Sequence, residues 1–253
     1  GNATAGDSGM ISFSTGKAVG GSGGAVLMAG GDGNTGDGGD MILSSGATSD
    51  AFSLGGEVAM TAGEASGEGA TGGKVTITAG VGSSTSSTDG GNGGDVIVTA
   101  GAALGSNNVS DVGGDVVVTA GEASTASGGN VVVMSGYSTS TSSGDMTLGT
   151  ADAGFYGASG SMSVFTGDAT AGSSGSYTVA TGGAVGGNGG GISLTVGDGH
   201  TGDGGDFVGT AGLTAGESAT AGSVPKLFTF FMKFKYIKKY IFIFSAIISV
   251  KGK

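Results

Sequence analysis

The chain has 253 residues, including 61 Gly, one Pro and no Cys or Trp, with a net charge of −11. Collagen is excluded because the glycines follow no period of three and proline is nearly absent. A disulfide framework and a cysteine zinc site are excluded because they require Cys. The glycine density also argues against an ordinary α-helical bundle.

Charge divides the chain into two parts. Residues 1–223 hold all 20 acids and only two lysines, whereas residues 224–253 hold seven lysines and no acid. The second part contains eight of the sixteen Phe and Tyr residues but a single Gly. We therefore predict a glycine-rich repeat domain over 1–223 and an unrelated Lys-, Phe- and Ile-rich tail over 224–253, with the junction at the only proline, Pro225.

The body is built from one repeat of 15 residues, present thirteen times with small insertions. Its pattern is small-Gly-x-apolar-x-apolar-x-small-Gly followed by six small or polar residues, and we number these positions place 1 to place 15. Clean copies read GGDVIVTAG, GGDVVVTAG and GGKVTITAG. The repeats begin at Ser8, Gly23, Gly38, Gly55, Gly72, Gly93, Gly113, Gly128, Ser143, Ser159, Ser174, Gly189 and Gly204.

Places 4 and 6 are large and apolar in 25 of 26 cases, and this period of two predicts a strand. Two apolar side chains per repeat form a core only if copies stack. We therefore predict an all-β fold, a single parallel β-solenoid (β-helix) of about 13 short Gly-rich coils. Val98, Val118 and Val133 are expected to stack and be buried.

Two other arrangements remain open. One coil could take two repeats, although the insertions in neighbouring repeats weigh mildly against this. An antiparallel meander is the second, although hairpin loops rarely keep a constant length of eight residues.

Units such as SGSMSVFTGDATAG and SGSYTVATGGAVGG give the chain a resemblance to a known group. Residues 7–222 resemble the very long glycine-rich repeat proteins predicted in diatom genomes. The resemblance implies an array within a larger secreted or surface protein, and no particular activity.

Acidic residues beside the apolar runs are the candidate metal ligands. Calcium-binding β-rolls also combine glycine-rich turns with Asp, but they have a nine-residue period and place the Asp differently. We expect no resident cofactor; calcium, bridging stacked acids, is the one candidate. Acids that keep a sheet margin soluble are the simpler explanation. The candidates are Asp37, Asp40, Asp95, Asp115, Asp203 and Asp206.

Other motifs carry less. Two GxGxxG strings, at 31–36 and 197–202, precede an expected strand, whereas a dinucleotide site needs a following helix. We expect no enzyme, because the chain has no Arg and one His, His200, and its acids recur with the repeat. An ice-binding Thr-x-Thr ladder is complete only at Thr76-Ile77-Thr78.

The expected function is structural: a self-associating component of an extracellular fibre, sheath or adhesive. The alternative is a ligand-binding solenoid for calcium, ice or glycan. Expected partners are copies of the chain and a polysaccharide, but no nucleic acid. We expect an extracellular or cell-surface location, with Asn2 and Asn108 as N-glycosylation candidates and hydroxyl clusters at 83–88 and 138–143 for further glycans.

The two ends carry separate expectations. The tail fits a translated noncoding sequence, a membrane-surface helix or anchor, or a native cap of the repeats; its apolar run, 240–250, is short for a membrane span. Gly1 is not an initiator Met and no signal peptide is visible, so we expect the natural N-terminus to be missing or processed.

Overall fold

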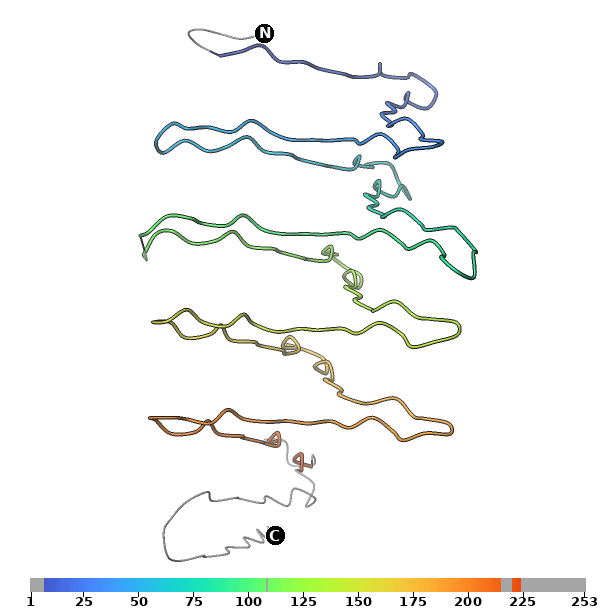
Figure 1. Ribbon diagram of the computed structural model, residues 1–253. Helices are drawn as coiled ribbons and strands as arrows, with labels where there is room; N and C mark the ends of the chain where they lie inside the picture. Colours follow the sequence, from blue (N-terminus) through green and yellow to red (C-terminus); the bar gives the residue numbers. More distant parts are fainter. Residues whose placement is uncertain (1–6, 108, 215–219, 224–253) are drawn as a thin grey trace, which may run out of the picture. The chain divides into compact units, whose positions relative to one another are not determined.

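The structure, a computed structural model, describes residues 7–107, 109–214 and 220–223. Within these ranges the chain forms no helix and no strand, and it alternates extended runs with turns and bends (Figure 1). The prediction of an all-β parallel solenoid is therefore wrong.

The extended runs fail to become strands because their backbones have no partners. Residues 95–99, for example, contain the strongest strand pattern of the chain, yet no hydrogen bond is formed by their N–H or C=O groups. A period of two reports a chain that is extended, with side chains on alternating sides. A sheet additionally requires a second backbone within hydrogen-bonding distance. The sequence pattern indicates an extended chain, but the fold provides no second backbone for residues 95–99 to pair with.

The expected inner ladder of apolar side chains is also absent. Val98, Val118 and Val133 are 73%, 75% and 72% exposed, so the prediction that they stack and are buried is wrong. None of the described residues is buried. Place 4 is the most covered of the three central places: Val116 is 57% exposed, compared with 79% for Val117 at place 5. Val118 at place 6 is 75% exposed, nearly as much as Val117, so exposure does not separate an inner from an outer side of the run as the solenoid prediction requires.

Successive repeats are joined by loops that bring the chain back to the end of the preceding extended run. The residue at place 2 lies beside place 9 of the repeat before it, as in the bond from Gly73 to Gly63. Hydrogen bonds between neighbouring extended runs recur at this point. We call it the clasp: the hydrogen-bonded contact between places 8 and 9 of one repeat and place 2 of the next.

The chain divides into two units, Gly1–Val133 and Met134–Lys253. The same alternation of extended runs and clasped loops is found in the described residues of each. This boundary falls within the eighth repeat. The boundary predicted at Pro225 and the whole tail, 224–253, lie outside the described residues.

Candidate functional site: clasped loops and exposed apolar runs

The backbone form of the clasp recurs along the described chain with nearly constant geometry. The N–H of the glycine at place 2 donates to the carbonyl oxygen of place 9 in the preceding repeat, at N···O distances of 2.8 to 3.2 Å. The donor–acceptor pairs are Gly39–Gly31, Gly56–Gly46, Gly73–Gly63, Gly94–Gly80, Gly114–Gly101, Gly129–Gly121, Gly144–Gly136 and Gly205–Gly197. Gly222, which follows the last of the thirteen repeats, donates to Gly212 in the same way.

A hydroxyl form of the clasp is found in three of the four repeats in which place 8 is Thr. Thr15, Thr166 and Thr181 each donate from Oγ1 to the carbonyl oxygen of the next repeat's place-2 glycine, at 3.1, 3.3 and 3.1 Å. At these three junctions the backbone bond is not formed. Ser45 combines both forms, since its Oγ donates to Gly56 O at 2.7 Å beside the backbone bond. A short hydroxyl thus substitutes for the backbone bond in closing the loop.

The clasp explains why place 2 is glycine in all thirteen repeats. A Cβ on Gly73 would lie 3.2 Å from the backbone N of Gly63 and 3.3 Å from the Cβ of Ala62. Contacts this short force the neighbouring chain to move, so only glycine permits the approach. Place 8 is Gly, Ala, Ser or Thr in twelve of the thirteen repeats, with Val196 as the exception, and its alanines are among the few half-buried residues of the described chain. These alanines are Ala62, Ala79, Ala100, Ala120 and Ala211.

The insertions fall in the loops, and the four longest loops keep the clasp; the junction of Thr150 with Gly160, where the loop has one extra residue, forms neither the backbone nor the hydroxyl hydrogen bond. The bond between Gly94 and Gly80 spans fourteen positions and that between Gly39 and Gly31 spans eight, yet both have an N···O distance of 2.9 Å. The longer loops form local bonds of their own. In the loop at 105–112, for example, Asp111 Oδ2 accepts from the N–H of Asn107 at 2.8 Å. These longer loops therefore absorb length without altering how repeats are joined.

The six acids predicted as metal ligands are all exposed. In the ranges that the structure describes, no three His, Asp or Glu side chains are grouped so that they could hold a metal ion. The two DGGD loops nevertheless share a backbone feature. Carbonyl oxygens of Gly36 and Asp37 approach Gly33 closely, and those of the equivalent residues, 202 and 203, approach Gly199. Carbonyl oxygens suit calcium, but the carboxylates do not converge with them. The calcium site stays a prediction.

The other candidates are placed as follows. The GxGxxG strings at 31–36 and 197–202 lie in clasped loops and lead into extended runs. His200 is exposed in the second of these loops. Asn2 and Asn108, the glycosylation candidates, lie outside the described residues. The hydroxyl clusters 83–88 and 138–143 form turn-like bends, in which Ser86 and Ser138 accept backbone N–H bonds from residues two and three positions ahead.

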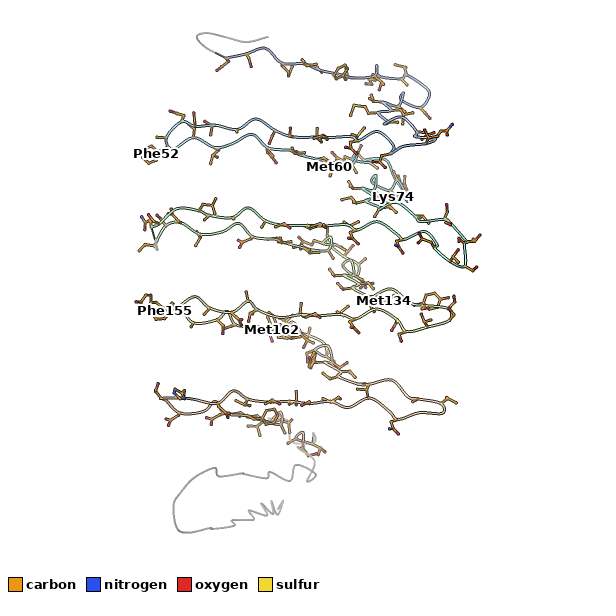
Figure 2. All side chains as sticks on the ribbon, viewed as in Figure 1. Phe52, Met60, Lys74, Met134, Phe155 and Met162 are labelled. Atoms are coloured by element: carbon orange, nitrogen blue, oxygen red, sulfur yellow. The ribbon has the colours of Figure 1, made fainter. Side chains whose placement is uncertain are left out.

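Sequence reasoning missed two loops that carry aromatic residues at their ends (Figure 2). Phe52 is fully exposed and has a φ of 63°, a conformation unusual for a bulky side chain. Phe155 and Tyr156 are 93% and 97% exposed, and their rings meet edge to face with centroids 4.7 Å apart. Both loops contain an Asp-Ala pair shortly before the aromatic residue, and this shared motif is not part of the 15-residue repeat.

The largest feature left for function is the set of exposed apolar runs at places 4 to 6. The large apolar side chains at these places are 43% to 88% exposed, as in Phe207 and Leu27. A soluble monomer rarely leaves large apolar patches uncovered. This arrangement presents a periodic apolar surface to other molecules.

Comparison with protein-family models, with curated proteins and with solved structures found no match to this chain. In the part of the chain that the structure describes, there is also no helix that is long and apolar enough to cross a membrane.

Proposed function

We propose that the protein is a structural component of an extracellular fibre, sheath or adhesive, that it assembles with copies of itself, and that it has no catalytic role. One observation carries the proposal: apolar runs recur at the same place of successive repeats and remain exposed. For example, the side chain of Val58 at place 4 is 47% exposed, and that of Ile97 at place 5 is 81% exposed.

Association would satisfy two needs of these runs together. Covering apolar side chains stabilises a complex in rough proportion to the area removed from water. Pairing the free N–H and C=O groups of an extended run adds backbone hydrogen bonds. A clasp supplies about one net hydrogen bond, roughly 1 kcal/mol, which is less than the conformational entropy lost on ordering a whole repeat. Contacts from another molecule would stabilise the ordered form.

A second copy of the chain is the partner that fits this surface. It presents extended runs of the same length and the same spacing, so several runs can pair at once. The acidic body opposes such pairing, because residues 1–223 hold all 20 acids and two lysines. Salt should therefore favour association by screening this repulsion. The extracellular location is proposed from the resemblance to diatom repeat proteins and from the hydroxyl-rich loops.

The proposal is tested by sedimentation of the full chain over a range of concentrations and salt, followed by electron microscopy. We expect concentration-dependent association that strengthens with salt, together with filaments or laterally joined arrays. A chain that stays monomeric at the highest concentration, at both low and high salt, would overturn the proposal.

A polysaccharide is the second candidate partner, and the aromatic loops favour it. Phe52, Phe155 and Tyr156 present almost fully exposed rings at loop ends, and a ring can pack against the apolar face of a sugar. Retention of the protein by an insoluble glycan, and its loss in the variant Phe52→Ser/Phe155→Ser/Tyr156→Ser, would support this. Equal retention of that variant and the unaltered chain would exclude the aromatic loops as the contact.

A further inference from the structure

We propose that copies of the chain pair through one part of the body, the valine block, and that its extended runs become antiparallel strands of an intermolecular sheet. The valine block comprises residues 96–98, 116–118 and 131–133. This inference rests on the proposed self-association and names the segments responsible for it.

Sequence sets the valine block apart from the other repeats. In three consecutive repeats, and nowhere else in the body, places 4, 5 and 6 are all Val or Ile. β-Branched residues are the most favourable in strands, because they pack well on a pleated surface. Short segments with high β-propensity, little charge and no proline are also those that form intermolecular sheets most readily.

The structure leaves these segments available on both their side chains and their backbones. At place 5, Ile97, Val117 and Val132 are 81%, 79% and 73% exposed. No hydrogen bond is made by the backbone of residues 96–98, 116–118 or 131–133. All three segments belong to the unit Gly1–Val133. A partner strand can therefore be added without breaking any bond of the free chain.

The clasps hold the ends of the block and leave its centre open. Gly94 and Gly114 are bonded to Gly80 and Gly101, and Gly129 is bonded to Gly121. Each glycine lies two positions before a segment of the block. Every segment therefore begins at a fixed point, and this limits the register in which it can meet a partner.

Charge selects the direction of pairing. Asp95 and Asp115 immediately precede two of the segments, and Thr99 and Thr119 follow them. In a parallel, in-register pair each Asp would face its own copy, and like charges opposite one another are destabilising. In an antiparallel pair centred on place 5, each Asp faces a Thr. The same two-fold arrangement places Ile97 opposite Ile97 and Val117 opposite Val117 of the other copy, a self-complementary contact.

The size of a stable interface explains why three segments are needed. A single extended run, one segment of the block with the residue on each side of it, buries much less surface than the roughly 1,200 Å² at which specific interfaces begin. Consecutive segments that pair simultaneously add their areas and make association cooperative. Repeats outside the block, in which place 5 is often Thr or Ser, can extend the contact after it has begun.

The test uses proline, which removes a backbone donor. The variant Ile97→Pro/Val117→Pro/Val132→Pro takes three N–H groups from the predicted sheet, although none of them is bonded in the free chain. Both copies in a pair lose three hydrogen bonds, six in all, and at a factor of about five for each bond we expect the concentration needed for association to rise about ten-thousandfold. The matched control is Ser87→Pro/Ala103→Pro/Ala126→Pro, at three loop N–H groups that are likewise unbonded. It should associate like the unaltered chain.

Sedimentation gives the association, and the infrared amide I band gives the strand direction. If the unaltered chain does not associate, both the proposed function and this inference are overturned. If it associates and the two proline variants behave alike, the valine block is wrong while self-association stands. Assemblies with no strand signal, or with the band of a parallel sheet, would likewise overturn the pairing described here. Loss of association in the block variant alone, with an antiparallel band, supports it.

Discussion

The two halves of the repeat differ in which forces hold them. The clasp residues at places 8, 9 and 2 are Gly, Ala, Ser or Thr with the single exception of Val196, and they form the recurring hydrogen bonds between neighbouring runs. The extended half carries the large apolar side chains, and Val116 to Val118 are 57% to 79% exposed. Small residues can therefore organise a chain locally, while its apolar surface remains free for another molecule.

The largest effect on this contrast is expected from a side chain placed inside a clasp. Gly73→Val would put its Cβ near the backbone N of Gly63 and near Ala62, so the clasp should open at a cost of about 2 kcal/mol. Hydrogen exchange at the residue-73 amide measures this as a loss of protection. Gly63→Ala is the control, because its Cβ would meet nothing within 4 Å. Equal protection in the two variants would contradict the clasp geometry.

A smaller effect is expected where only a hydroxyl closes the loop. Thr181→Val removes the donor to Gly190 O, at a cost of about 1 kcal/mol. Ser45→Ala removes a similar hydroxyl but leaves the backbone bond between Gly56 and Gly46, so it should cost less. Chemical shifts of the residues flanking each clasp report its population. A larger change in the Ser45 variant would show that the two forms are not alternatives.

The extended half should tolerate a charge when the chain is dilute and monomeric. Val118→Asp is expected to change clasp protection at Gly114 and Gly129 by less than about 0.5 kcal/mol, because this side chain is 75% exposed. A buried ladder would instead predict a loss of several kcal/mol. Glu122→Gln, also exposed, serves as the control and should have no larger effect. A large loss in the dilute monomer would indicate that Val118 is covered.

The smallest effect concerns divalent cations. The acids of the DGGD loops do not form a metal-holding group among the described residues, so calcium should act only by reducing repulsion between acidic bodies. Calcium and magnesium at equal concentration should then promote association equally. Calorimetric titration of the dilute chain provides the check. A saturable heat with calcium and none with magnesium would instead indicate a specific site.

The sequence allowed part of this architecture to be predicted. The repeat length, the extended conformation and the position of insertions all depend on local chemistry, which a pattern of glycines and alternating valines reports directly. Whether extended runs pair into a sheet depends on segments that are distant in the sequence, and a hydrophobic period of two gives no information about such pairing. Val118 was predicted to be buried because two apolar side chains per repeat suggested stacking, but the structure leaves those side chains uncovered.

The candidate site was predictable to a similar extent. Apolar residues at place 5, such as Ile97 and Val117, are visible in the sequence, and the structure leaves them exposed. The clasp was not foreseen, although its requirement for a glycine at place 2 is visible in every repeat. The 15-residue repeat does not predict the aromatic loops, because Phe52 and Phe155 lie in loops that contain insertions.

The clasps also give the chain hidden length. Most loops are closed by one weak hydrogen bond, so tension along the chain would first open clasps, one after another. Opening the contact between Gly39 and Gly31 would release eight residues, or about 25–30 Å of contour. The contact between Gly94 and Gly80 would release fourteen residues. A fibre made of such chains would stretch and dissipate work before its covalent backbone bears the load, and single-molecule pulling should reveal steps of these unequal lengths.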